Sequence, residues 1–244
     1  MGMESGVRRH RPVHGVSIGI VVLDTSFRRL PGDVGNASTF VYPVQYAIAR
    51  GVTPQKIVRA EPENLLGPFL SAVDELVALG VDGITTTCGF AALYHRELVE
   101  HSPVPVASSS LLQVPFVQAM LPAGRKVGIL TSNADALTDR HLEAVGCPSG
   151  LPTEGLLPGS IIHANNRSNA ATIDQAAQEA EVVEAAIRLV ASDPAIGAIV
   201  MECANFPPYA ARVFEAAGLP VYDTVSMIDW FHAGLKPRRY SGAD

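Results

Sequence analysis

Two cysteines stand at matching places in a sequence that repeats its own plan. Cys88 lies in TTTCGF and Cys203 in VMECANF, and each follows an apolar run typical of a buried strand. Cys88 precedes Pro105 by 17 residues, Cys203 precedes Pro220 by 17 residues, and each proline is followed by a valine. The shared spacing indicates an internal duplication that carries one thiol in each half.

Two thiols on opposite sides of one cleft suit the inversion of a carbon next to a carboxylate. This reaction removes a proton from one face and returns one to the other, so a thiolate and a thiol can act as base and acid. A helix that begins after each cysteine would favour the thiolate through its amide groups and dipole. Polar side chains near the strand ends are candidates for holding the charge that develops on the carboxylate: Thr85, Thr86, Thr87, Thr131, Ser132 and Asn133.

Strands and helices alternate along the chain, which predicts a parallel α/β architecture. Apolar, β-branched runs predict strands at 16–23, 80–87, 104–110, 126–132, 196–202 and 219–223. Helical spacing of apolar residues predicts helices at 63–79, 89–100, 110–121, 134–145, 173–192, 207–217 and 224–233.

The order of these elements predicts two similar α/β domains related by a pseudo-twofold axis. The first would span residues 1–117 and recover the final segment 222–244, and the second would span 118–221. Ligands of open parallel sheets bind beyond the carboxyl ends of the strands. We therefore expect the active site in the cleft between the domains.

Composition limits the classes of function. The chain has 244 residues, of which 48% are hydrophobic and 17% charged, a composition typical of globular proteins. Its net charge of −6 does not suggest a nucleic-acid-binding surface. The basic cluster RRHRPVH at 8–14 is predicted to be a solvated tail. The sequence contains no run of 18 apolar residues, so no membrane span is expected. Its three cysteines are widely spaced, which predicts free thiols in a reducing cytoplasm. A homo-oligomer is left open.

The sequence resembles the aspartate/glutamate/hydantoin racemase superfamily in TTTCGF, in VMECANFPPYA and in the opening IGIVVLDTSFRRLPGDVGN. The resemblance implies two α/β domains and cofactor-independent racemisation, with Cys88 and Cys203 as the acid-base pair. It also implies that Asp24, Thr25, Thr131, Ser132 and Asn133 line the cleft. The superfamily includes arylmalonate decarboxylases, which use one cysteine, and maleate isomerases, which use two.

The residues beside the cysteines depart from the pattern of amino-acid racemases. Those enzymes place Asn-Thr after the first cysteine and Thr after the second, where this chain has Gly89-Phe90 and Ala204-Asn205. Asn205 could instead cap the following helix. The complete set of expected substrate-binding residues is Asp24, Thr25, Thr86, Thr87, Gly89, Thr131, Ser132, Asn133, Glu202, Ala204 and Asn205.

Several structural explanations compete with these roles. A free cysteine is often a small buried hydrophobe, as expected for Cys147, which has no counterpart in the other half. Asp24 could cap a turn, and Glu202 could either orient Cys203 or lie at a polar edge. The loop RRLPGDVGN could be a plain turn or a flap that brings Arg28 or Arg29 to an anionic ligand.

The predicted function is a cofactor-independent racemase or epimerase acting on a small anionic substrate such as an amino acid or a hydantoin. An arylmalonate-type decarboxylase and a maleate-type cis-trans isomerase are alternatives on the same scaffold, and a small-ligand-binding protein is the non-enzymatic alternative. Neither zinc nor pyridoxal phosphate is expected, because no close Cys or His pair occurs and no lysine ends a predicted strand.

Overall fold

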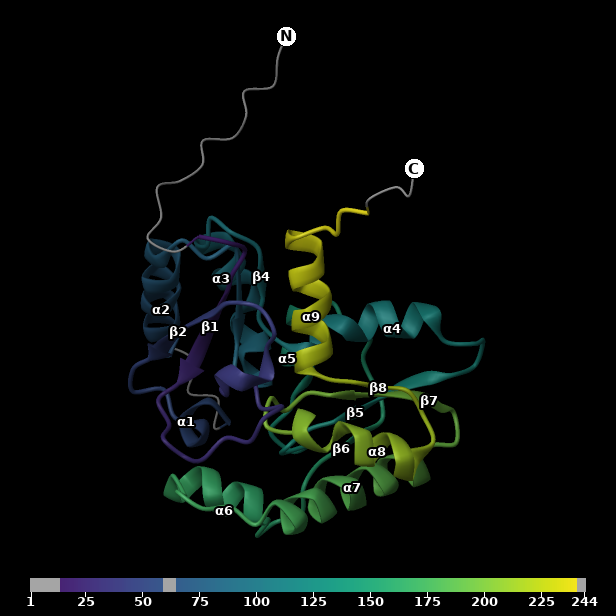
Figure 1. The fold of residues 1–244 in the computed structure, drawn as a ribbon. Helices are drawn as coiled ribbons and strands as arrows, with labels where there is room; N and C mark the ends of the chain where they lie inside the picture. The colour runs from purple at the N-terminus through teal and green to yellow at the C-terminus, as the bar shows by residue number, and fades with distance from the viewer. Residues whose placement is uncertain (1–13, 59–64, 241–244) are drawn as a thin grey trace.

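The computed structural model describes residues 14–58 and 65–240 of the chain (Figure 1). Its described strands form two parallel four-stranded sheets, with the orders β2-β1-β3-β4 and β6-β5-β7-β8. The first sheet consists of β1 (Ile18–Leu23), β2 (Val44–Ala49), β3 (Gly83–Thr86) and β4 (Val106–Ala107). The second consists of β5 (Lys126–Leu130), β6 (Thr153–Glu154), β7 (Ile196–Met201) and β8 (Val221–Tyr222). The identical order confirms the predicted pair of similar α/β halves.

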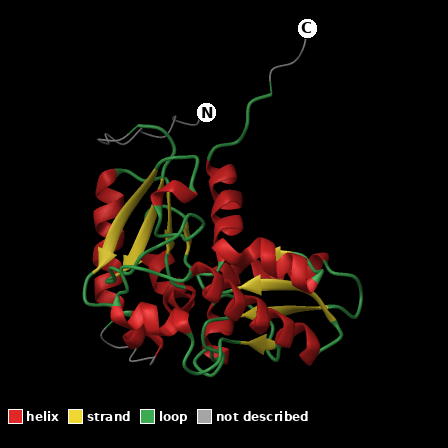
Figure 2. Cartoon of the chain, turned by 60° about the horizontal axis from the view of Figure 1, so that its bottom comes forward, coloured by secondary structure: helices red, strands yellow, loops and turns green. Residues whose placement is uncertain are grey.

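Helices surround both sheets, and Figure 2 shows the two groups of strands side by side among them. The α-helices are α1 (Pro54–Val58), α2 (Leu66–Leu79), α3 (His95–His101), α4 (Val114–Met120), α5 (Asp139–Ala144), α6 (Ile161–Ser168), α7 (Gln175–Ser192), α8 (Ala210–Ala217) and α9 (Thr224–Leu235). Short 3₁₀ helices are η1 (Ala37–Thr39), η3 (Gly89–Tyr94), η4 (Ser110–Gln113) and η5 (Pro207–Tyr209).

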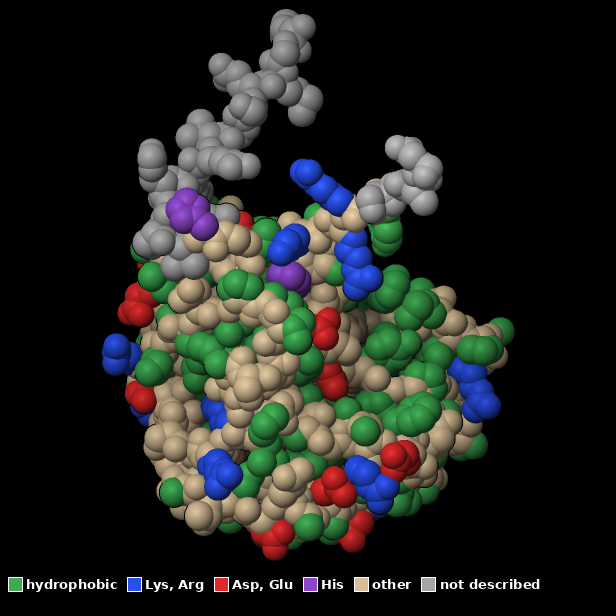
Figure 3. All heavy atoms as spheres, in the orientation of Figure 1, with side chains coloured by type: hydrophobic (Ala, Val, Ile, Leu, Met, Phe, Trp, Pro, Cys, Tyr) green, Lys and Arg blue, Asp and Glu red, His purple; other side chains and the backbone are tan. Residues whose placement is uncertain are grey.

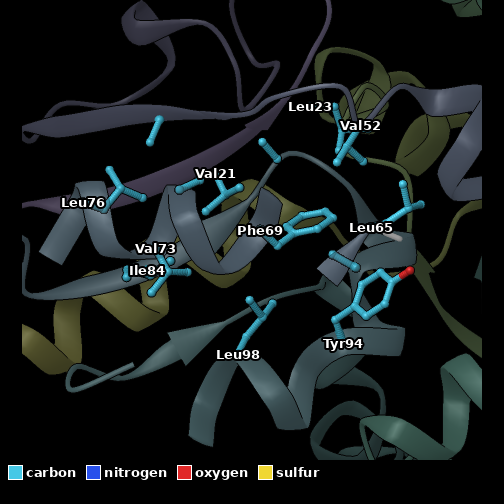
Figure 4. Packing of buried hydrophobic residues seen from close by; sticks show 14 of the residues in the cluster. Val21, Leu23, Val52, Leu65, Phe69, Val73, Leu76, Ile84, Tyr94 and Leu98 are labelled. Atoms are coloured by element: carbon cyan, nitrogen blue, oxygen red, sulfur yellow. The ribbon is translucent and has the colours of Figure 1, made fainter. Parts of the chain in front are cut away.

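The first sheet is covered on both faces. On one face, Phe69 and Leu76 of α2 pack with Val21 and Ile84 of the sheet, as Figure 4 shows. On the other, α9 contributes Met227 and Ile228 to a cluster with Ile18 and Ile20. Helix α9 begins at a capping box, in which Asp223 and Ser226 satisfy each other's backbone amides, and it returns the end of the chain to the first sheet.

The second sheet is also covered on both faces. Val182 and Leu189 of α7 and Val213 of α8 pack on one face, where Asp174 caps the start of α7. Val114 and Val117 of α4 pack on the other face, together with Leu142 of α5. Buried parallel strands of this kind are apolar on both faces, which explains the continuous apolar runs in the sequence.

Several elements differ from the predictions, among them α1, which no predicted helix covers. The sequence did not indicate β2 and β6, the edge strands that pair with the first strand of each sheet, because β2 is only partly buried and β6 has two residues. It also did not indicate α6, whose polar residues lack apolar helical spacing. The basic cluster at 8–14, apart from His14, and the first residues of the helix predicted at 63–79 lie outside the described residues.

The surface carries charges of both signs. On the face drawn in Figure 3, acidic and basic side chains are scattered among hydrophobic and other atoms. Within residues 14–58 and 65–240, no helix combines the length and the apolar character that a membrane span requires.

Candidate active site

A cavity lies where the carboxyl ends of the two sheets meet, and both Cys88 and Cys203 line it. Cys88 follows β3 and Cys203 follows β7, which are the equivalent strands of the two sheets. The cavity measures about 50 Å³. Since one water needs roughly 10–15 Å³ of such space, a cavity of this size suits a compact ligand.

The backbone turn at Cys88 is held by the side chain of Thr86. The Thr86 hydroxyl donates to the carbonyls of Cys88 (2.9 Å) and Ser108 (2.8 Å), and it accepts from the Cys88 amide (3.2 Å). Cys88 itself is the residue before η3 and has an extended backbone. Thr86 therefore stabilises the backbone at Cys88, and its side chain is not among those that line the cavity.

Burial, together with the negative charge of Glu202, raises the pKa of the Cys88 thiol to about 12. The amide groups of Phe90 and Ala91 and the charge of Arg29 act in the opposite direction. Burial and Glu202 likewise hold the pKa of Cys203 well above its ordinary value, against an amide hydrogen bond from Asn205. The amides thus favour the thiolate, as expected, but burial outweighs them, so the pKa of each cysteine stays above its ordinary value.

Glu202 places a buried carboxyl group beside the two thiols. Its Oε2 accepts a 2.7 Å hydrogen bond from the Thr131 hydroxyl, and Oε1 has no hydrogen-bond partner. Burial raises the pKa of Glu202 to about 7, and the bond from Thr131 partly offsets this rise. The carboxyl group can therefore change its protonation state near neutral pH.

The loop after β1 brings a cation to the same cavity. Arg29 lines the cavity, donates to Asp33 Oδ1 (2.8 Å) and to the Thr25 hydroxyl (3.0 Å), and stacks on the Phe27 ring at 4.3 Å. The predicted flap is therefore a structured loop, in which Arg29 reaches the cavity and Arg28 is exposed.

Hydrogen bonds join this loop to the second half of the chain. Asn205 donates to Asp33 Oδ2 (2.6 Å) and accepts from Asn166 of α6 (3.2 Å). The Ser26 amide donates to Asn169 Oδ1 (2.8 Å). The prediction that Asn205 caps a helix is wrong: Phe206 holds that place before η5 without a side-chain bond, and Asn205 reaches across the cavity instead.

The cavity brings together most of the residues proposed from the sequence. Those that line it are Thr25, Thr87, Cys88, Gly89, Ser132, Glu202, Cys203, Ala204 and Asn205. Four others lie elsewhere. Thr86 and Thr131 support the turn and Glu202, as described above, while the Asp24 carboxylate accepts from the Gly51 amide and Asn133 Oδ1 accepts from the Ala136 amide. Asp24 and Asn133 thus stabilise turns.

Sequence reasoning missed several lining residues, which are Leu23, Phe27, Pro54, Ile57, Val58 and Asn166. Asn166 lies on α6, which carries no apolar pattern, and the apolar residues resemble ordinary core. Cys147 is buried away from this cavity and donates to the Leu111 carbonyl at 3.3 Å. Among the described residues, no group of three or more His, Cys, Asp or Glu side chains could hold a metal ion.

Comparison with known proteins gives relatives across nearly the whole chain. The dimethylsulfoniopropionate lyase of Durusdinium sp. clade D is 30% identical, and the match covers 96% of this chain and 82% of that protein. Similar solved structures include the allantoin racemase of Klebsiella pneumoniae, with a TM-score of 0.61, 16% identity and coverage of 91% of this chain and 87% of that one.

Arylmalonate decarboxylase is also similar in structure, with a TM-score of 0.60, 17% identity and coverage of 93% of this chain and 97% of that one. At these low identities, the two solved structures establish the fold alone. The family model described as Asp/Glu/Hydantoin racemase matches residues 43–230, more than half of the chain. The paired strand ends, the shared fold and this match together show that the chain belongs to the Asp/Glu/hydantoin racemase family.

Proposed function

We propose that this protein removes a proton from the carbon next to a carboxylate, without a cofactor, and that Cys88 and Cys203 are its acid-base residues. The observation that supports this proposal most directly is that both thiols, one from each sheet, line a single cavity. Arg29 would hold the substrate carboxylate. Among the described residues that line the cavity, it is the only one with a permanent positive charge.

The carbanion formed in this step can end in two ways, and we favour β-elimination. A thiolate takes the α-proton, the C–H electron pair forms the new double bond, and the leaving group departs from the β-carbon with its own bonding pair. From dimethylsulfoniopropionate, this sequence yields acrylate and dimethyl sulfide. The 30% identical lyase of Durusdinium, aligned over 96% of this chain, supports this outcome. Gly89 and Ala204 offer no polar side chain for an α-amino group.

Inversion of the α-carbon is the second candidate, and the second thiol favours it. A racemase needs an acid on the face opposite its base, whereas elimination of a neutral sulfide needs one base only. Decarboxylation of an arylmalonate has weaker support, because it also needs one thiol and rests on a likeness at 17% identity.

The test is an assay of the purified chain in deuterium oxide. One arm contains dimethylsulfoniopropionate, and the others contain single enantiomers of aspartate and glutamate. Elimination releases dimethyl sulfide and acrylate, measured by gas chromatography and proton NMR. Inversion gives an α-deuterated product of opposite configuration. The absence of both elimination and α-deuterium in every arm would contradict the proposal.

Cysteine variants separate the two outcomes. If both thiols transfer protons in an inversion, Cys88→Ser and Cys203→Ser should lose similar activity. If one thiol is the base of an elimination, one variant should lose far more than the other. Cys147→Ser is the matched control, because Cys147 is buried outside the cavity and serine can keep its hydrogen bond to the Leu111 carbonyl.

A further inference from the structure

The carboxyl group of Glu202 is buried in the cavity wall with one oxygen unsatisfied. Glu202 is 1% exposed, Thr131 binds Oε2, and no described group binds Oε1. A buried polar atom without a partner costs free energy, so its persistence calls for a group that satisfies it at some stage of function. Glu202 is also one of the residues that line the ligand cavity.

Gly89 makes room for this carboxyl group. A Cβ atom at Gly89 would overlap Oε1 and the backbone oxygen of Glu202, so a side chain at this position would exclude the observed arrangement. The residue after the first cysteine therefore contributes space, which Glu202 of the other half fills. Both residues line the cavity together with Cys88.

Arg29 supplies the opposite charge in the same cavity. Its two hydrogen bonds, to Asp33 and Thr25, use two of the five N–H groups of a guanidinium. Its packing leaves little freedom, since the side chain is 12% exposed and a Cβ at Gly35 would overlap it. A fixed planar cation of this kind matches a carboxylate ligand.

We propose that Glu202 and Arg29 are the two charged poles that select a zwitterionic substrate, with its carboxylate on Arg29 and its cationic β-substituent facing Glu202. The assignment rests on the proposed reaction for the identity of the carboxylate end. To the proposed reaction it adds two points: Glu202 and Arg29 determine specificity, and the leaving group of the substrate must carry a positive charge.

This arrangement also links recognition to the thiols. The negative charge of Glu202 raises the pKa of both Cys88 and Cys203, whereas Arg29 lowers that of Cys88. A substrate cation beside Glu202 offsets the first effect, so the bound substrate itself favours formation of the thiolate. A neutral substrate of the same shape leaves the thiols protonated.

The test measures binding rather than turnover, so it is independent of the proposed reaction. Isothermal titration calorimetry compares 3-(trimethylammonio)propanoate with 4,4-dimethylpentanoate, which replaces the ammonium nitrogen by carbon and keeps the shape. At pH 8, the wild-type chain should prefer the ammonium compound by about tenfold, on the scale of a partly buried charge pair. Equal affinity for the two compounds would overturn the proposal.

Two variants assign the poles. Glu202→Gln should reduce the preference to less than about twofold, whereas Arg29→Met should weaken both compounds by about the same factor and keep the preference. Glu154→Gln, an exchange of the same type on β6 outside the cavity, should leave both affinities unchanged. A preference that survives Glu202→Gln would overturn the role of Glu202.

A pH series on the wild type needs no variant. Glu202 acts on both thiols, the charge of Arg29 also acts on Cys88 and that of Asp33 on Cys203, and burial raises the pKa of Glu202 itself to about 7. Its carboxylate gains a proton as the pH falls below this value, so the preference should decrease from pH 8 to pH 6. A preference that is constant over this range contradicts the proposal. If the protein shows the charge preference but no α-proton chemistry, the binding roles of Glu202 and Arg29 stand and the proposed reaction is wrong.

Discussion

The two halves of the molecule place a cysteine at the same strand end but surround it differently. Around Cys88, the hydroxyls of Thr85 and Thr86 bond to the carbonyls of the neighbouring segment at Ala107 and Ser108, within the same half. Before Cys203, the corresponding strand ends on a buried carboxyl group. The two halves thus share the strand order and the thiol, but only the second has a buried carboxyl group directly before its cysteine.

The residues after the cysteines differ in the same way. Gly89 leaves space and Phe90 packs edge-on to His141, whereas Ala204 fills its position and Asn205 reaches Asp33 in the other half. The thiols therefore occupy unequal environments. An inversion that runs equally well in both directions gains nothing from this inequality, whereas a one-way elimination can use one thiol as the base. The following predictions test how far the halves differ in function.

The largest effect is expected at the thiols. Cys88→Ser or Cys203→Ser should lower kcat/KM by about 10²–10⁴-fold where the replaced thiol transfers a proton, because a serine hydroxyl is a far weaker acid and base at neutral pH. Steady-state kinetics on the substrate that the deuterium assay identifies provides the measurement. Activity in both variants within twofold of the Cys147→Ser control would remove the acid-base role of the pair.

Glu202 should make the stability of the molecule depend on pH between about 4.5 and 7. Its pKa is about 7 in the folded chain against 4.5 ordinarily, so folding keeps a proton that the unfolded chain releases. The contribution of Glu202 to stability therefore decreases as the pH rises from about 4.5 to 7, by about 3 kcal/mol. The free energy of unfolding of Glu202→Gln, relative to wild type, should rise by this amount between pH 4.5 and 8 in urea titrations. A constant difference would show that Glu202 is ionised throughout.

Gly89→Ala copies the residue of the second half into the first. The added methyl group overlaps the side chain and the backbone oxygen of Glu202, so we expect destabilisation by about 2–3 kcal/mol, as for an overpacked core. The reverse change, Ala204→Gly, should cost only about 1 kcal/mol, because it adds backbone freedom and removes one buried methyl group. Urea unfolding of both variants checks the asymmetry, and equal costs would contradict it.

The smallest effect is expected where Asn205 joins the halves. Asn205→Ala removes the bond to Asp33, whose carboxylate keeps Arg29 and the Gly35 amide as partners, so the cost should be about 1 kcal/mol. Asn165→Ala on α6 is the control, since this half-buried asparagine lies outside that chain of bonds. Thermal unfolding that shows no difference between the two variants would remove the stabilising role of Asn205.

Much of this molecule follows from local patterns in the sequence. The apolar runs of β1, β3, β5 and β7 determined the parallel sheets, and the matched spacing after Cys88 and Cys203 determined the duplication, because burial on both faces leaves a continuous hydrophobic signal. The edge strand β6 and the polar helix α6 gave no such signal, since little of either faces the core.

The character of the site was decided only in three dimensions. Sequence placed Glu202 next to Cys203, but the unpartnered oxygen beside Gly89 results from the meeting of two halves 113 positions apart in the chain. The same holds for Arg29, which could be proposed as a flap residue but not placed beside Cys88. The backbone amides that follow a cysteine are set by the local sequence, whereas the desolvation of its thiol depends on every segment of the chain that covers it. For this reason the sequence suggested amides that favour thiolates, whereas burial, greater for Cys203 than for Cys88, raises the pKa of both thiols.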